Sequence, residues 1–341
     1  MTKYYFKDDY SEGCHPNILK KLLNTNFEIH DGYGDDEYSN EAKQIIAEKI
    51  GDKNANIHFI SGGTLANLII ISAILKPHES IISPSTGHIN THEAGAIEAT
   101  GHKINPIKSS DGKIRVNDIQ SILDEHTTIP HMVKPRMVYI SNSTEIGTVY
   151  KKRELKELSE YCKENDLFLF LDGARLGSAL CSKGNDLSLS DIFHLTDIFY
   201  IGGTKNGALL GEAVVIKNDE LKKDFPFHMK QRGALMSKGR LIGIQFVELF
   251  KDDLFFDLAR HANSMAMKIA KAVEQKSHSL LTKSTSNQIF PILPNILVEK
   301  LEKKYGFYRW EKMNNKETAI RLVTSWATKE NIVNKFISDL D

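Results

Sequence analysis

Short apolar segments alternate with longer amphipathic ones along the first two thirds of the chain. NIHFI (56–60), SIISP (80–84) and RMVYIS (136–141) have the length and composition of largely buried β-strands. Between such runs lie segments such as KRELKELSEYCKEND, whose apolar residues recur at three- and four-residue spacing and predict helices. The alternation continues to about residue 217 and predicts an α/β fold, with a mostly parallel sheet covered by helices on both faces.

Several helix boundaries are also marked in the sequence. Pro16 suits the first turn of a helix predicted over 16–23. Asn40 is predicted to cap a helix that Gly51 ends. The HEAGAIEATG segment is predicted to be helical as well.

The C-terminal third has a different pattern. From about residue 225 to 275 it is helical, and beyond that short strands alternate with helices, including the strand-like TAIRLVTSW. We therefore predict three parts, namely an N-terminal segment that packs with the small domain, a large α/β domain, and a small C-terminal α+β domain (1–30, 31–250 and 251–341).

Composition and charge exclude several classes of partner. The chain has 44 Lys and Arg residues and 44 Asp and Glu residues, so it offers no basic field to nucleic acid or to an anionic membrane. The most apolar run, LANLIIISAIL, is too short to span a bilayer, and the N-terminus lacks the apolar segment of a signal peptide. Three scattered cysteines fit a reducing compartment, and we expect a cytoplasmic protein.

Two charged residues end separate strand-like runs. LFLFLD ends at Asp172, and DIFYIGGTK ends at Lys205. In open α/β sheets ligands bind beyond the carboxyl ends of the strands, so this acid and this amine are predicted to face one crevice. Pyridoxal 5'-phosphate (PLP) needs such a pair, a lysine that bonds the cofactor and an acid that keeps the pyridine nitrogen protonated. Taken alone, an Asp at a strand end such as Asp172 is also typical of a turn, and a Lys such as Lys205 is typical of a solvated loop. The two residues together favour the cofactor.

A strand, a glycine-rich turn and a helix follow one another at NIHFISGGTLAN. The unpaired N–H groups and the dipole of a helix start favour an anion there. Gly62 and Gly63 allow close approach and Thr64 offers a hydroxyl, so we predict a phosphate site, although Gly-Gly-Thr is also typical of an ordinary helix start. Neither a Walker loop nor GxGxxG is present, which disfavours a dinucleotide.

Three further polar residues are candidates for the crevice. Asn142 follows another strand and is predicted to point toward it. His88 favours packing against a cofactor ring. Its alternatives are a core histidine or a metal site with His92, which would need a third ligand. Arg321 lies between apolar neighbours in a strand, where an arginine either pairs structurally or binds a ligand carboxylate.

Five motifs occur in a fixed order along the chain: SGGTLAN, GHINTHEAG, ISNST, LDGARL and GGTKNGALLGEAVV. In this order and spacing they resemble the L-threonine aldolase (β-eliminating lyase) family of fold-type I PLP enzymes, over nearly the whole chain. The resemblance implies the fold-type I architecture with a seven-stranded, mostly parallel sheet. It also implies a homodimer or homotetramer whose active site lies at a subunit interface.

The resemblance assigns roles to individual residues as well. Lys205 matches the cofactor-bound lysine, Asp172 the acid on the pyridine nitrogen, and His88 the histidine stacked on the ring. The other matches are Gly63 and Thr64 at the phosphate, Asn142 in the family's Glu-Asn-Thr motif at the cofactor, His131 as a second active-site histidine, Arg175 beside cofactor and substrate, and Arg321 at the substrate carboxylate.

Two departures from the family pattern concern the substrate. The family's Arg-Ser-Asp near the N-terminus is Lys7-Asp8-Asp9 here, and Asp8 would repel a substrate carboxylate if it took the place of the serine. The family's Glu-Asn-Thr is Ser-Asn-Ser around Asn142. Neither change touches the residues matched to the cofactor.

The resemblance implies retro-aldol cleavage of L-threonine, L-allo-threonine and related β-hydroxy-α-amino acids to glycine and an aldehyde. His88 and His131 are both candidate bases for the β-hydroxyl proton. Two alternatives remain. One is another fold-type I PLP enzyme, either a β-eliminating lyase or an aminotransferase that returns a keto acid. The other is a paralogue that binds PLP without catalysis.

Overall fold

A seven-stranded sheet forms the centre of the large domain. The computed structural model describes residues 3–341, and the strand order is β2-β8-β7-β6-β5-β3-β4. Strand β8 is antiparallel to β2 and β7, whereas the other neighbours are parallel. The predicted fold class is therefore confirmed. The strands are β2 (Asn56–Ile60), β3 (Glu79–Pro84), β4 (Lys103–Ile107), β5 (Lys134–Ser141), β6 (Phe168–Asp172), β7 (Ile198–Gly202) and β8 (Glu212–Ile216).

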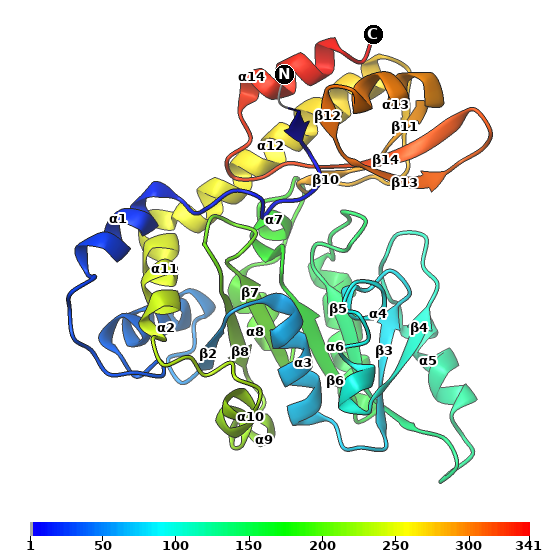
Figure 1. Ribbon diagram of the computed structural model, residues 1–341. Helices are drawn as coiled ribbons and strands as arrows, with labels where there is room; N and C mark the ends of the chain where they lie inside the picture. The colour runs from blue at the N-terminus through cyan, green and yellow to red at the C-terminus, as the bar shows by residue number, and fades with distance from the viewer. Residues whose placement is uncertain (1–2) are drawn as a thin grey trace.

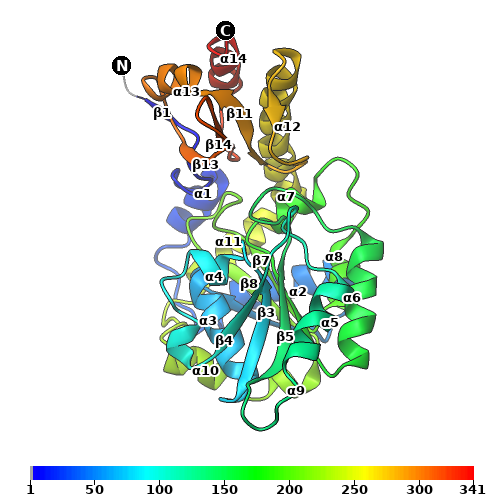
Figure 2. The ribbon, with the colours of Figure 1, turned by 90° about the vertical axis from the view of Figure 1, so that its right-hand side faces the viewer.

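Helices cover both faces of this sheet (Figure 2). One face packs against α3 (Gly63–Ile74) and α10 (Phe225–Gln231). The other packs against α2 (Glu37–Ile50), α5 (Val116–Glu125), α6 (Lys152–Glu164), α8 (Leu189–Leu195) and α11 (Arg240–Phe250). Shorter helices are α4 (His88–Thr91), η1 (Glu98–Thr100), α7 (Leu176–Leu180), α9 (Asp219–Lys222) and η2 (Lys251–Asp253).

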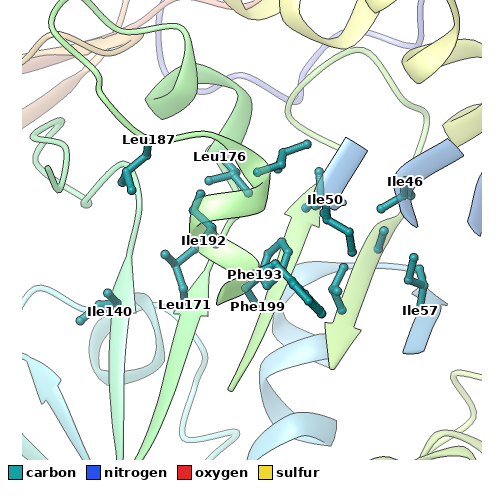
Figure 3. Packing of buried hydrophobic residues seen from close by; sticks show 14 of the residues in the cluster. Ile46, Ile50, Ile57, Ile140, Leu171, Leu176, Leu187, Ile192, Phe193 and Phe199 are labelled. Carbon is teal, nitrogen blue, oxygen red and sulfur yellow. The ribbon is translucent and has the colours of Figure 1, made fainter. Parts of the chain in front are cut away.

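Strand alternation decides which side chain enters which core. Phe168 and Phe170 point to the core beneath α3, whereas Leu169 and Leu171 point to the opposite core. Figure 3 shows Leu171 on that opposite side, packed among side chains of the sheet and helices. Because every second residue faces α3, Asp172 at the end of β6 faces α3 too.

The small domain lies at one end of the sheet and contains the first described strand, β1, and the C-terminal helix, α14 (Figure 1). Helix α12 (Leu254–Gln275) leads into it, followed by β9 (Ser279–Leu280), β10 (Gln288–Ile289), β11 (Pro291–Pro294), α13 (Asn295–Glu302), β13 (Tyr308–Lys312), β14 (Glu317–Val323) and α14 (Glu330–Ser338). The N-terminal strand β1 (Tyr4–Tyr5) pairs with β12 (Tyr305–Gly306). Helix α1 (Pro16–Asn24) then packs against α11.

One predicted helix boundary and one predicted helix were wrong. Helix α2 begins at Glu37, because the Asp36 carboxylate accepts a hydrogen bond from the Ser39 N–H at 2.8 Å and caps it; Asn40 lies inside the helix. Its predicted end at Gly51 is confirmed, with φ of 79°. The segment predicted as a helix over 92–101 contains only the 3-10 turn η1, because Ala94 and Gly95 take positive φ values.

Within residues 3–341, no helix combines the length and the apolar character needed to cross a membrane. The three cysteines, Cys14, Cys162 and Cys181, are all free thiols.

Candidate active site

Asp172 is held by hydrogen bonds from three directions. Its Oδ2 accepts from Tyr139 Oη on β5 at 2.6 Å and from Asn67 Nδ2 on α3 at 3.2 Å. Its Oδ1 accepts from the Ala174 N–H at 3.0 Å. The side chain is therefore buried and fixed at the carboxyl end of β6, with its carboxylate turned toward α3.

Asp172 remains an anion despite its burial. Burial by itself raises the pKa of the Asp172 carboxyl, but hydrogen bonds from Tyr139, Tyr200 and the Ala174 N–H favour the charged form and bring the pKa below its usual value. A buried carboxylate of this kind favours a cationic partner, and a protonated pyridine nitrogen is such a partner.

A hydrogen-bonded network joins His88 to Asp172. His88 Nδ1 lies 2.8 Å from Glu93 Oε1, which also accepts from Asn67 Nδ2 at 2.7 Å. Asn67 donates to Asp172 as well, so one amide connects the two acids. Because a carboxylate can only accept, Nδ1 of His88 carries the proton when the ring is neutral, and Nε2 is left as an acceptor. The ring lines the cavity described below.

Lys205 follows β7 in a loop that Glu212 on β8 fixes. Glu212 accepts hydrogen bonds from the Gly203 N–H at 3.1 Å and from the Thr204 hydroxyl at 2.8 Å. Burial and, next in size, the Arg175 guanidinium lower the pKa of the Lys205 amine. A lowered pKa favours the neutral amine, which is the nucleophilic form.

The start of α3 offers unpaired N–H groups to an anion. Gly62 is the N-cap residue, and no side chain caps the helix. A Cβ on Gly63 would lie 3.2 Å from the Tyr200 hydroxyl, whereas one on Gly62 would meet nothing within 4 Å. Thr64 is exposed at this helix start and lines the same cavity with both glycines. The geometry is that of a phosphate site.

Arg175 forms a buried ion pair with the N-terminal segment. Its Nε and Nη2 donate to the two carboxylate oxygens of Asp9 at 2.7 and 3.0 Å, and Asn287 Nδ2 donates to Asp9 at 2.9 Å. Asp8, the candidate for substrate contact at the position of the family's serine, accepts a hydrogen bond from Ser11 and does not line the cavity. The neighbouring Asp9 turns inward instead and is only 1% exposed.

We expect Asp9→Asn to lower the free energy of unfolding by about 3 kcal/mol, because it leaves the Arg175 guanidinium buried without its counter-charge. The positive charge of Arg175 holds the pKa of Asp9 below its ordinary value, against the effect of burial. The stabilisation is therefore present above the pKa of an unfolded aspartate and is lost as the pH falls through the folded pKa. Urea unfolding at pH 7 and at acidic pH measures both effects.

Asp8→Asn is the matched control for this variant. Asp8 is adjacent in sequence, but its hydrogen-bond partner is the exposed Ser11 hydroxyl, so we expect a change within about 0.5 kcal/mol. Equal losses in the two variants would contradict the role given to the Asp9 ion pair.

Arg321 on β14 lies near the guanidinium group of Arg175. Its Nη2 donates to Gln288 Oε1 at 2.8 Å, its guanidinium lies 5.7 Å from the centre of the Trp310 ring, and its Nε is buried without a partner. Burial, and then repulsion by Arg175, lower the pKa of Arg321 to about 10. Two guanidinium groups that repel each other favour an anionic ligand between them.

Asn142 does not reach the cavity, contrary to prediction. Along β5, Tyr139 and Ser141 face the cavity side, so the next residue points to the opposite core. There the Asn142 Oδ1 accepts a hydrogen bond from the Tyr150 N–H at 3.2 Å, and the side chain is fully buried. The prediction had the right strand and the wrong side of it.

His131 lies at the wrong end of the sheet for the predicted role. It is exposed and precedes β5, whereas the cavity lies at the carboxyl end of that strand. In Figure 1 the loop between α5 and β5 hangs at the end of the sheet opposite the small domain. An eight-residue strand spans roughly 23 Å. His131, predicted as a second active-site histidine, therefore lies outside the cavity of its own chain.

The carboxyl end of the sheet holds a cavity of about 280 Å³, and Arg321, Asn142 and His131 are not among the residues that line it. Its lining includes Tyr10, Ser61, Gly62, Gly63, Thr64, His88, Ser141, Ser143, Glu145, Asp172, Ala174, Arg175, Tyr200, Thr204, Lys205 and Glu212. PLP carries a phosphate, a ring nitrogen and an aldehyde, and the cavity offers a helix start, a buried carboxylate and an amine of lowered pKa to match them. The residues present therefore fit this cofactor.

Several members of the site could not be singled out beforehand. Tyr139 and Asn67 donate to Asp172, and Glu212 holds the loop that precedes Lys205. Each of the three sits in an apolar strand or helix and resembles an ordinary core polar residue in sequence. Their one sequence signal is the alternation itself, because Tyr139 takes the same side of its strand as Asp172. Asp9 keeps the aspartate of the family's Arg-Ser-Asp, but nothing near it in sequence indicates its partner, since it meets Arg175 across 166 positions.

Comparison with solved structures defines the class to which this fold belongs. The chain superposes on threonine aldolase from Leishmania major with a TM-score of 0.97, at 50% identity over 99% of this chain and 98% of that one. It also shares its fold with an aspartate aminotransferase from Thermus thermophilus, at a TM-score of 0.74 and 13% identity over 99% of this chain and 90% of that one. The architecture is that of the fold-type I PLP enzymes.

Sequence comparison narrows this class to a family. Residues 9–293 match the model of the family described as β-eliminating lyase. The chain is 31% identical to the low specificity L-threonine aldolase of Pseudomonas aeruginosa, over 99% of this chain and 97% of that protein. The chain therefore belongs to the β-eliminating lyase family, and the expected resemblance is confirmed.

Proposed function

We propose that this protein is a PLP-dependent L-threonine aldolase, which cleaves L-threonine, L-allo-threonine and related β-hydroxy-α-amino acids to glycine and an aldehyde. The observation that carries the proposal is one cavity that joins Lys205, Asp172 and the open start of α3. The threonine aldolases among its relatives, similar over nearly the full length, support the choice of substrate.

Each part of the cofactor has a residue to hold it. Lys205 would bond the aldehyde carbon, Asp172 would keep the proton on the ring nitrogen, and the N–H groups at Gly63 and Thr64 would receive the phosphate. When bound, the cofactor supplies an electron sink for the pair of the broken Cα–Cβ bond. His88, at the cavity wall, would pack against the ring.

Arg321 and Arg175 would orient the substrate through its carboxylate. Arg321 has a buried Nε without a partner, and Arg175 donates hydrogen bonds from Nε and Nη2 to Asp9, which leaves its other N–H groups for a ligand. A carboxylate clamped by a guanidinium fixes the amino acid at Cα, and this orientation determines which Cα bond breaks.

His88 is the base that the geometry favours for the β-hydroxyl proton. Glu93 accepts the proton of Nδ1, so Nε2 is free to accept another, and Glu93 stabilises the imidazolium that results. His131 lies outside the cavity of its own chain and is not assigned this role.

The direct test is aldehyde release. The purified protein with PLP is mixed with L-threonine or L-allo-threonine, and acetaldehyde is followed with a coupled alcohol dehydrogenase. We expect acetaldehyde and glycine in equal amounts. A keto acid without acetaldehyde would indicate an aminotransferase, and a cofactor spectrum without any product would indicate a paralogue that binds PLP without catalysis.

We expect Arg321→Gln to raise KM for threonine about 100-fold and to lower kcat less. The substitution removes a charged partner of the substrate carboxylate, worth roughly 3 kcal/mol when partly buried. Steady-state kinetics of acetaldehyde release measure the changes in KM and in kcat separately. Arg309→Gln is the control, because Arg309 lies on neighbouring β13, faces solvent and pairs with Glu302. An unchanged KM in Arg321→Gln would remove Arg321 from the substrate site.

We further propose that the chain works in the cytoplasm as a homodimer or homotetramer, supplying glycine. Three free thiols agree with a reducing compartment. Exposed apolar side chains on and after α1, among them Leu23, Phe27 and Ile29, agree with a covered surface. Light scattering of the purified protein would test the assembly.

A further inference from the structure

Glu145 lies at the cavity wall beside His88, and the proposed reaction gives it no role so far. Its Oε1 accepts a hydrogen bond from the His88 N–H at 3.0 Å and another from the Ser141 hydroxyl at 2.6 Å. His88 begins α4, and Ser141 is the last residue of β5. The Glu145 carboxyl therefore joins the start of a short helix to the carboxyl end of a central strand.

His88 is held by two glutamates from two directions. It is the first residue of α4, and Gly87 before it has no side chain that could cap this helix. The Glu145 carboxyl takes that place, because it accepts the first N–H group of the helix. Glu93 holds the imidazole ring through Nδ1 at 2.8 Å. One acid therefore fixes the backbone of His88, and the other fixes the ring.

The backbone before His88 is packed closely against the sheet. A Cβ on Gly87 would collide with Ser83 Oγ and would lie 3.3 Å from the ring of Tyr139. Tyr139 is also the residue whose hydroxyl donates to Asp172 at 2.6 Å. The parts that fix the imidazole and the parts that fix the buried acid of the cavity therefore belong to one packed framework.

We propose that Glu145 is a positioning residue for His88, and that its hydrogen bond to the His88 backbone sets the place from which Nε2 reaches the β-hydroxyl of the substrate. This role rests on the proposed function, in which His88 is the base. A displacement of about 1 Å in a catalytic group can cost about 100-fold in rate, so one contact to the backbone is enough to matter.

Glu145 supplies this contact as a hydrogen-bond acceptor and not as a negative charge. Its Oε2 is buried and has no hydrogen-bond partner among residues 3–341, an arrangement that disfavours a carboxylate. Burial raises the pKa of the Glu145 carboxyl more than the hydrogen bond from Ser141 lowers it, which favours the neutral acid. Since Oε1 accepts both hydrogen bonds, the Oε1 of a glutamine can accept the same two.

Hydrogen–deuterium exchange of the purified protein tests the contact directly. In Glu145→Ala we expect the His88 amide, followed in a peptide over residues 86–92, to exchange about tenfold faster, the factor that corresponds to one lost hydrogen bond. Glu145→Gln should exchange like wild type. A peptide over β6 reports on general loosening of the sheet and should keep its rate in both variants. Unchanged exchange at His88 in Glu145→Ala, or equal acceleration in both peptides, would overturn the proposal.

Steady-state kinetics with PLP test whether the contact matters for the reaction. We expect Glu145→Ala to lower kcat for threonine by up to about 100-fold, because the base is displaced. KM should change little, because Arg321 and Arg175 are untouched. Glu145→Gln should restore kcat to near the wild-type value. Equal losses of kcat in the glutamine and alanine variants would overturn the proposal, because the charge of the carboxylate would then be what the reaction needs.

Glu79→Ala is the matched control. Glu79 is another buried glutamate whose carboxyl accepts a backbone N–H, that of Lys76 at 2.8 Å. It begins β3, at the end of the sheet away from the cavity, and does not line the cavity. We expect this variant to keep the wild-type kcat and the wild-type exchange of the His88 amide.

Failure of this role and failure of the proposed function give different results. A wild-type protein with PLP that releases no acetaldehyde would defeat the proposed function, and the assignment of the base with it. Normal acetaldehyde release in wild type, together with an unchanged kcat in Glu145→Ala, would defeat the positioning role alone.

Discussion

Lys205→Ala is expected to abolish covalent cofactor binding and to reduce acetaldehyde release by roughly ten-thousand-fold, the scale of loss when a covalent catalytic group is removed. Lys205 is the amine of lowered pKa in the cavity, and alanine leaves no group that could bond the cofactor aldehyde. The measurements are the visible spectrum after reduction with borohydride and the rate of aldehyde release. Because Lys205 is partly buried and makes no ion pair within residues 3–341, we expect the fold to survive.

Lys217→Ala is the matched control for this result. Lys217 is also partly buried and also has a pKa lowered by burial, but it follows β8 at the far end of the sheet and donates to the His194 carbonyl. We expect Lys217→Ala to keep the cofactor spectrum of wild type and to release aldehyde at a rate within twofold of wild type. Persistent covalent binding in Lys205→Ala would refute the assignment of the cofactor lysine.

Asp172→Asn is expected to lower kcat about a thousandfold while PLP still binds. The asparagine keeps the volume and can still accept from Tyr139 and Asn67, but it removes the negative charge that would hold the ring nitrogen protonated. Breaking such a buried charge pair costs about 4 kcal/mol, which corresponds to this factor in rate. Single-turnover rates at saturating PLP isolate the chemical step from cofactor affinity.

Asp197→Asn separates this catalytic effect from general damage to the sheet. Asp197 precedes β7, at the end of the sheet opposite the cavity. Its carboxylate accepts a hydrogen bond from the Leu169 N–H at 2.8 Å. Its loss should lower stability and leave kcat unchanged. If both variants keep the wild-type kcat, the role of Asp172 in keeping the ring nitrogen protonated is refuted.

The sequence predicted most of the fold because the central strands are apolar and bounded by turn residues. NIHFI became β2 over the predicted residues, and SIISP lies entirely within β3. The sequence did not determine a helix start where two neighbouring residues could each cap the helix. Asn40 and Asp36 are both good caps, and the choice between them depended on a hydrogen bond to Ser39 that sequence spacing alone does not determine.

The candidate site was predictable where it depends on strand ends and not where it depends on tertiary contacts. Asp172 ends one buried strand and Lys205 follows another, so the sheet brings them together. His131 precedes a strand, which placed it at the other end of the sheet, and Asn142 comes one residue too late to share a face with Tyr139. The choice of Asp9 over Asp8 required the position of Arg175, which no local pattern contains.

The buried ion pair between Asp9 and Arg175 has a consequence for the order of folding. Asp9 meets Arg175 across 166 positions of sequence and Asn287 across 278. Contacts between residues so far apart in the chain carry a large loop-closure entropy and form only after the segments between them have come together. This corner of the site therefore depends on both domains being folded, and a variant that unfolds the small domain alone would leave Arg175 with an incomplete set of partners.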